Sequence, residues 1–245
     1  MNDSTTLTTL SDWFETEQGK QLVAYECAQI ARFLPDCFGS ELLQIGGPRK
    51  SEWLDASPIK HKIYLSSEIG ANADGSTCVA HPFYLPFLPD SLDVILLPHS
   101  LECVQEPRAL LAEACDVLKP GGFMIITGIN RKSLWGIQHG YQHLKSKYSY
   151  FPWLQQFLSI HSIENKLLQN NCVIDGTHIG CYQGVGEGNA AWLKEHSLLD
   201  ILGPLLWPTF GAVYVILARK KIPGWIVVPE KSLRDEFCET KVGWV

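Results

Sequence analysis

A strand–helix–strand pattern over Leu85–Asn130 constrains the fold of this chain more than any other feature. Leu92–Leu97 is a short apolar run bounded by proline-containing turns, which is typical of a buried strand. Pro107–Leu118 has apolar residues at helical spacing, and a Lys-Pro-Gly-Gly turn then ends the helix. Phe123–Thr127 is a second apolar run. Two apolar strands joined by a crossover helix predict a right-handed parallel unit with both faces covered.

The rest of the chain continues this alternation of strands and helices. At 245 residues the chain is long enough for one sizeable α/β domain. We predict a three-layer α/β sandwich around a mostly parallel, seven-stranded sheet. The further strands are expected at Glu41–Gly46, Lys62–Leu65, Thr77–Ala80, Cys172–Tyr182 and Ala212–Ala218, and the further helices at Ser11–Phe38, Pro152–Asn170 and Ala190–Leu202.

Charge and cysteine usage exclude several classes of protein. A net charge of −6 argues against nonspecific binding to nucleic acid, because neutralising phosphates needs a basic field. The eight cysteines are scattered, and no pair has Cys-x-x-Cys spacing, so we predict no metal site and give a redox site little support. Scattered thiols without a signal peptide fit a cytoplasmic protein.

One apolar segment approaches the length of a membrane span. Leu198–Ala218 is interrupted by Pro204, Pro208 and two glycines, so a helix end, a turn and a buried strand explain it better than a span. We therefore predict no integral membrane segment. An enzyme that contacts the membrane peripherally through Leu198–Trp207 and acts on a lipid or quinone-like substrate stays open as an alternative.

Several motifs in the central region resemble a known family. Leu-Pro-Phe from Leu85, Ser-Leu-Asp-Val from Ser91 and Leu-Lys-Pro-Gly-Gly from Leu118 look like the central region of class I S-adenosylmethionine-dependent methyltransferases, of the methyltransferase type 11 kind. Leu-Pro-His-Ser-Leu-Glu from Leu97 and Ser-Leu-Trp-Gly from Ser133 are similar to a poorly characterised bacterial branch of that family. The resemblance implies a Rossmann-like fold with an antiparallel last hairpin, and S-adenosylmethionine as cofactor.

The resemblance also implies a cofactor site at the carboxyl ends of the strands. A glycine turn would let the backbone approach the methionine part of the cofactor, since no Cβ intervenes. Gln44 stands where the family usually has an acid, Glu68 is the nearest carboxylate to the ribose position, and His81 stands on the adenine side. The candidate cofactor-binding residues are Gln44, Gly46, Gly47, Glu68, His81, Pro98 and His99.

His99 is the candidate catalytic residue. It follows the fourth predicted strand and could remove a proton from a substrate hydroxyl or amine near neutral pH. Glu102, three residues later, would orient it if a turn of helix begins there. The alternative is that His99 caps a turn or lines the cofactor without chemistry.

The segment after Asn130 is unusually aromatic and is expected to contact substrate. In the family, the connection after the fifth strand often builds a substrate lid, and aromatic side chains line apolar pockets. A satellite core beneath a long connection is the alternative. The candidate substrate residues are Asn130, Trp135, Tyr141 and His143.

These observations predict a single methyltransferase-like domain. It would comprise N-terminal helices (1–40), a cofactor-binding half (41–130), a substrate half (131–220) and a tail (221–245). The expected activity is methyl transfer from S-adenosylmethionine to a small or medium apolar molecule. Because Gln44, Pro48 and His81 depart from the family pattern, a catalytically inactive binding or regulatory protein is the alternative. The sequence leaves the oligomeric state open.

Overall fold

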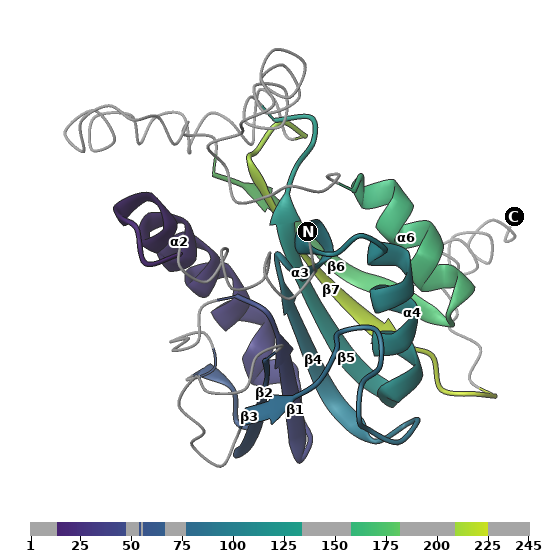
Figure 1. Ribbon diagram of the computed structural model, residues 1–245. Helices are drawn as coiled ribbons and strands as arrows, with labels where there is room; N and C mark the ends of the chain where they lie inside the picture. Colours follow the sequence, from purple (N-terminus) through teal and green to yellow (C-terminus); the bar gives the residue numbers. More distant parts are fainter. Residues whose placement is uncertain are drawn as a thin grey trace, which may run out of the picture.

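The computed structural model of the protein describes residues 14–47, 54, 56–66, 77–133, 158–181 and 209–224. The described strands form a seven-stranded sheet in the order β3-β2-β1-β4-β5-β7-β6, with helices on both faces (Figure 1). The predicted three-layer α/β sandwich is confirmed. The strands are β1 (Glu41–Ile45), β2 (His61–Ser66), β3 (Thr77–Val79), β4 (Leu92–Pro98), β5 (Leu118–Ile129), β6 (Cys172–Gly180) and β7 (Val213–Lys220).

The sheet is parallel except at β7. Strands β1 to β5 pair in parallel, whereas β7 runs antiparallel to both β5 and β6. The antiparallel last hairpin that the resemblance implied is therefore present. The predicted Lys-Pro-Gly-Gly turn lies within β5, where Gly121 has φ +84° and the pairing with β4 shifts register between Leu92 and Val94.

The longest described helix begins at a side-chain cap. Helix α2 spans Glu17–Phe33, and the Thr16 hydroxyl accepts a hydrogen bond from the Gly19 amide at its N-terminus. The helix expected over Ser11–Phe38 thus ends at Phe33, and Ser11 lies outside the described residues. The others are η1 (Leu34–Asp36), α3 (Ser100–Cys103), α4 (Pro107–Val117) and α6 (Ile160–Gln169).

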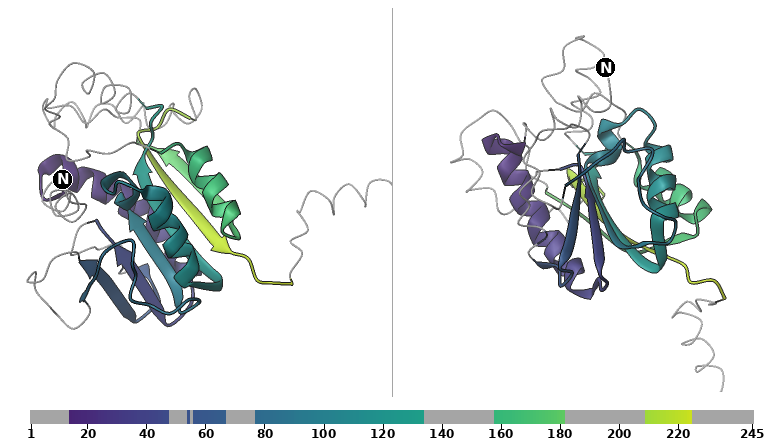
Figure 2. Two further views of the ribbon diagram at one scale, coloured as in Figure 1. Left: turned by 45° about the vertical axis from the view of Figure 1, so that its right-hand side comes forward. Right: turned by 60° about the horizontal axis from the view of Figure 1, so that its bottom comes forward.

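Alternate residues of the central strands pack against different helices, as expected for a sheet covered on both faces. Helix α2 lies on one face and α4 and α6 lie on the other (Figure 2). Ile95 and Ile126 belong to the core under α4 and α6, while Leu96 and Ile125 belong to the core under α2. A third buried cluster gathers Phe14, Leu22, Cys103, Ile129, Ala212 and Val213.

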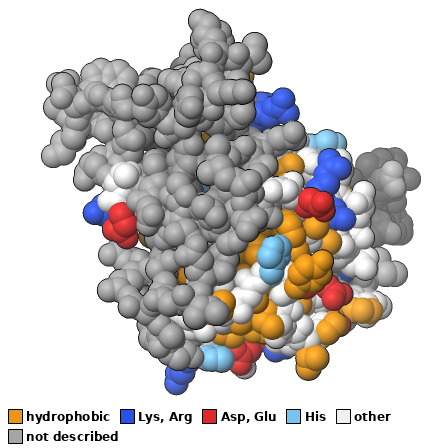
Figure 3. Space-filling view, viewed as in Figure 1, with side chains coloured by type: hydrophobic (Ala, Val, Ile, Leu, Met, Phe, Trp, Pro, Cys, Tyr) orange, Lys and Arg blue, Asp and Glu red, His pale blue; other side chains and the backbone are white. Residues whose placement is uncertain are grey.

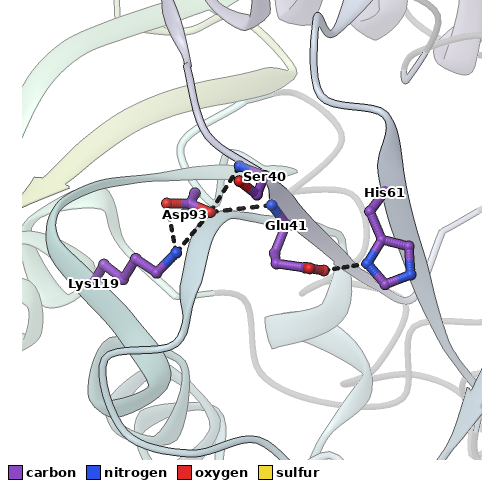
Figure 4. A network of polar contacts seen from close by, with 5 residues as sticks. All are labelled: Ser40, Glu41, His61, Asp93 and Lys119. Carbon is purple, nitrogen blue, oxygen red and sulfur yellow. Dashed lines mark hydrogen bonds and ion pairs between the residues drawn. The ribbon is translucent and has the colours of Figure 1, made fainter.

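A polar network holds the amino ends of the strands together (Figure 4). One Asp93 carboxylate oxygen accepts hydrogen bonds from the Ser40 and Glu41 amides at 2.9 and 3.0 Å. Both Asp93 oxygens also lie 2.9 Å from the Lys119 ammonium. Burial raises the pKa of Asp93, but the hydrogen bonds from Lys119 and the two amides outweigh it, so the net pKa is lowered. This network joins β1, β4 and β5 at the edge opposite the predicted cofactor site.

Candidate functional site

The strand order reverses between β1 and β4. The chain moves from β1 outward to β3, then returns to pair β4 on the other side of β1. In open α/β sheets, ligands bind outside the carboxyl ends of the strands at such a point. Gly46 and Gly47 follow β1, and Pro98 ends β4, so these predicted cofactor residues lie at this point.

The turn after β1 depends on glycine. Gly46 and Gly47 have φ angles of +75° and +73°, a conformation that L-residues with a side chain rarely adopt. A Cβ on Gly47 would lie 2.5 Å from the Pro98 Cγ, so the turn packs against the end of β4. The buried Gln44 side chain donates a hydrogen bond from Nε2 to the Gly46 carbonyl at 2.8 Å. The structure thus brings Gln44, both glycines and Pro98 into contact.

The connection from β4 to α3 lies next to the glycine turn. His99 has φ +52° and precedes α3, so the backbone turns sharply where β4 ends. The buried Ser100 hydroxyl donates back to the Ile45 carbonyl at the end of β1. This bond fixes the start of α3 next to the glycine turn.

The His99 side chain lies between two buried carboxylates. Its Nδ1 is 2.8 Å from a Glu102 oxygen in α3, and its Nε2 is 2.8 Å from a Glu26 oxygen in α2. All three side chains are essentially inaccessible to solvent, and the Phe14 ring lies 5.6 Å from the imidazole, centroid to centroid. The carboxylates approach opposite nitrogens, so the three side chains do not converge on one point as metal ligands would. We call Glu26, His99 and Glu102 the buried triad.

The two carboxylates control the protonation of His99. Burial lowers the pKa of His99, but the negative charges of Glu26 and Glu102 and their hydrogen bonds raise it by more, to about 10. His99 is therefore an imidazolium at neutral pH, with both N–H groups donating. The triad links α2, far away in the sequence, to the end of β4.

Glu102 extends this network to the end of β5. Its second oxygen accepts a hydrogen bond from the Ile129 amide. A Cβ on Gly128 would lie 2.2 Å from the Tyr214 hydroxyl and 2.9 Å from Glu102 Oε1, so β5 needs glycine here. Burial, followed by the charges of Glu102 and Glu26, raises the pKa of Tyr214 well above its usual value. The carboxyl ends of β4 and β5 are thus tied together beneath the surface.

This geometry does not suit the predicted role of His99 as a base. A general base needs a free lone pair within reach of the proton that it removes. Both His99 nitrogens are engaged, the ring is 0% exposed, and its raised pKa keeps it protonated. The prediction that Glu102 orients His99 from a turn of helix agrees with the structure. Glu26, from a helix distant in the sequence, occupies the His99 nitrogen that a substrate would need.

His81 lies on the surface, in the segment that follows β3. Its ring contacts Phe83 and Tyr84, with centroids 5.1 and 5.8 Å away. Tyr84 and Leu88 are each 78% exposed. Figure 3 shows that hydrophobic side chains gather on the described part of the face seen in Figure 1. Among the described residues, His81 therefore belongs to an exposed apolar surface following β3.

The Asn130 side chain forms hydrogen bonds to backbone groups of two segments. Its side-chain amide donates to the Thr209 and Gly211 carbonyls at 2.7 and 2.9 Å, which holds the approach to β7 against the end of β5. Its Oδ1 accepts from the Lys132 amide at 3.1 Å. Its predicted contact with substrate stays a prediction. The remaining predicted site residues, Glu68, Trp135, Tyr141 and His143, lie outside the described residues.

Sequence reasoning missed Glu26, although a signal was present. Leu22 and Ile30 face the core from α2, and Glu26 lies one turn from each of them. A carboxylate in a buried helical stripe needs a partner, because burying an unpaired charge is costly. The sequence could have shown that a partner was required, but not that it would be His99.

Comparison with known proteins agrees with this architecture. The methyltransferase domain family matches residues 62–126. An S-adenosylmethionine-dependent methyltransferase from Thermotoga maritima superposes with a TM-score of 0.58 at 15% identity, covering 90% of this chain and 100% of that one. The fold is thus that of the class I methyltransferases.

The family model thus matches the central part of the chain, and at 15% identity the superposition shows the likeness of the fold alone. The chain is 31% identical over 113 residues to the uncharacterized protein YafS of Escherichia coli K12, covering 45% of this chain and 44% of YafS. It is 27% identical over 139 residues to the uncharacterized protein MJ1123 of Methanocaldococcus jannaschii, covering 56% and 65%. The chain thus spans less than two thirds of these relatives. No helix within the described ranges is long and apolar enough to cross a membrane.

Proposed function

We propose that this protein transfers the methyl group of S-adenosylmethionine to a small or medium apolar molecule. The observation that carries the proposal is the Gly46–Gly47 turn, with φ angles of +75° and +73°, at the point of the sheet where the strand order reverses. Backbone without a Cβ at that point allows close approach of a ligand. The methyltransferase domain match over residues 62–126 supports the same activity.

The glycine turn suits the methionine part of the cofactor, whereas Gln44 supplies no charge to it. When bound, S-adenosylmethionine supplies an electrophilic methyl on a sulfonium. Gly46 and Gly47 would pass its methionine portion, and Pro98 would limit the site on the β4 side. Gln44 provides no charge there, because a side-chain amide is neutral, and its Nε2 donates to the Gly46 carbonyl. Glu68 and His81 remain the proposed contacts to the ribose and the adenine side.

The chain's contribution to catalysis would be positioning. Methyl transfer needs an acceptor held in line with the methyl group and shielded from water. The buried triad suits this task, because it fixes α2, α3 and the ends of β4 and β5 relative to one another. We assign His99 a positioning role, and a proton lost by the acceptor would pass to solvent or another group.

Calorimetric titration with S-adenosylmethionine, and with its demethylated product, tests the proposal. We expect Gly46→Ala to weaken cofactor binding at least about tenfold, because a Cβ would intrude on the ligand. Gly224→Ala is the matched control: Gly224 also has a positive φ, +89°, but a Cβ there meets nothing within 4 Å. Both substitutions place a side chain at a positive φ, so both strain the backbone. Weaker cofactor binding in Gly46→Ala alone would then reflect lost access of the ligand and not lost stability.

An inactive methyltransferase-like binding or regulatory protein is the second candidate. Its support is that Gln44 directs its amide to the chain's own backbone, and that the turn packs against Pro98. If the wild-type protein binds neither ligand at millimolar concentration, the methyltransferase proposal is wrong and this candidate takes its place.

A further inference from the structure

Two buried cysteines lie together at the amino end of the sheet. Cys115 is in the last turn of α4, and Cys172 is the first residue of β6, 57 positions later in the chain. Their sulfur atoms are 3.5 Å apart, within hydrogen-bonding distance for thiols. Cys115 is 2% exposed and Cys172 is 0% exposed. Sequence spacing gave no sign of this pair.

The surroundings of the pair favour a thiolate on one sulfur. The hydrogen bond with Cys115 lowers the pKa of the Cys172 thiol; burial opposes this, and the charges of Lys220 and Lys221 assist it. The same hydrogen bond and burial raise the pKa of Cys115. The Lys220 ammonium also donates to the Cys115 carbonyl at 2.8 Å, which keeps its charge near the pair. One sulfur is thus set up as the nucleophile and the other as the proton donor.

We propose that Cys115 and Cys172 form a redox-responsive dithiol that a peroxide oxidant converts into an intramolecular disulfide. The Cys172 thiolate attacks one peroxide oxygen, and an S–O bond forms as the O–O bond breaks. The departing hydroxide takes up the proton that Cys172 released on ionising, which leaves a sulfenic acid and water. The Cys115 sulfur then attacks the Cys172 sulfur, an S–S bond forms, and a second water leaves. Two thiols lose two electrons and two protons in total, and the peroxide is reduced to two waters.

Each cysteine of the pair has an exposed neighbour in the sequence. Asp116 and Asn171 are exposed, and they are the immediate neighbours of the two cysteines. A local opening at the end of α4 would admit a small peroxide. The sulfurs would then approach by about 1.5 Å to reach disulfide distance.

Cys37 provides a contrast within the same protein. It is buried, its thiol donates to the Phe33 carbonyl at 3.3 Å, and burial raises its pKa to about 12. Among the described residues no second thiol is hydrogen-bonded to Cys37, and its raised pKa disfavours the thiolate, so it should stay reduced when the pair is oxidised.

The disulfide would link α4 to β6 at the edge opposite the Gly46–Gly47 turn. It is therefore expected to stabilise the fold without blocking the proposed cofactor site. The inference is independent of the proposed function, because a protein that binds no cofactor would still carry the pair.

Peptide mapping of the full chain after treatment with hydrogen peroxide tests the inference. We expect a cross-linked peptide joining Cys115 to Cys172 as the main product, reversed by dithiothreitol. The melting temperature of the oxidised protein should rise by about 5–10 °C, as expected for a disulfide closing a long loop. Cys115→Ser and Cys172→Ser should each abolish the product and the shift, whereas Cys78→Ser, at a half-buried cysteine in β3, should change neither.

The wild-type map decides the outcome even if a variant folds poorly. Recovery of Cys115 and Cys172 as free thiols while other cysteines are oxidised would overturn the inference. A disulfide of either residue with another cysteine as the main product would also overturn it.

Discussion

The carboxyl ends and the amino ends of the strands are held by ion pairs that differ in burial. At the carboxyl edge, the buried triad of Glu26, His99 and Glu102 lies entirely out of solvent. At the amino edge, Asp93 and Lys119 form a pair whose side chains are 17% and 38% exposed. Both networks join segments far apart in the sequence, so their connectivity alone does not distinguish them.

The difference lies in what happens when one partner is lost. An exposed charge that loses its partner is solvated by water, so such pairs contribute little to stability. A buried charge that loses its partner stays in a medium of low dielectric constant, and the penalty is large. The buried triad should therefore tolerate substitution poorly, and the amino-edge network should tolerate it better.

Replacing His99 should produce the largest effect. We expect His99→Leu to lower the free energy of unfolding by about 3–5 kcal/mol, because Glu26 and Glu102 would face each other without a counter-charge. Urea denaturation at neutral pH measures the change. His161→Leu is the matched control, since His161 is exposed on α6, and it should change stability by less than about 0.5 kcal/mol. Equal losses in the two variants would contradict the proposed importance of burial.

Alkaline pH should weaken the triad without any substitution. The pKa of His99 is raised from 6.5 to about 10 in the folded protein. The stability that this shift contributes is fully present below pH 6.5 and is lost as the pH rises to about 10, by at most about 1.4 kcal/mol per pH unit.

His99→Leu is the reference protein for this measurement, because lysine, tyrosine and cysteine side chains also titrate at alkaline pH. Unfolding should be measured for both proteins from pH 6 to pH 10.5, and the difference between them should shrink across the window. A difference that is constant with pH would exclude an imidazolium at position 99.

The sequence predicted the fold well and the chemistry of the triad poorly, for a physical reason. Strands and the α4 helix follow from local patterns such as the apolar run at Leu92–Leu97. The glycine turn after β1 was also predicted, because the backbone conformation of such a turn depends only on its own residues. The role of His99 depends on Glu26, which lies 73 positions away in the chain and reaches it only through packing of α2. Local spacing cannot report such a contact.

The Asp93 network should give an intermediate effect. We expect Asp93→Asn to lower the free energy of unfolding by about 1–2 kcal/mol near neutral pH, because charged hydrogen bonds to two amides and the Lys119 ammonium are weakened. The pKa of Asp93 is lowered from 3.8, so its contribution is present above pH 3.8 and is lost as the pH falls through the folded value. Asp116→Asn, at an exposed position at the end of α4, is the control.

The pair between His61 and Glu41, at the amino ends of β2 and β1, should give the smallest effect (Figure 4). The His61 side chain is 59% exposed, so water solvates either group when the other is removed. We expect His61→Gln to change the free energy of unfolding by less than about 0.5 kcal/mol, with little dependence on salt. Urea denaturation at low and high ionic strength measures both quantities. A loss approaching that of His99→Leu would mean that connection between strands, and not burial, determines how strongly an ion pair holds this sheet.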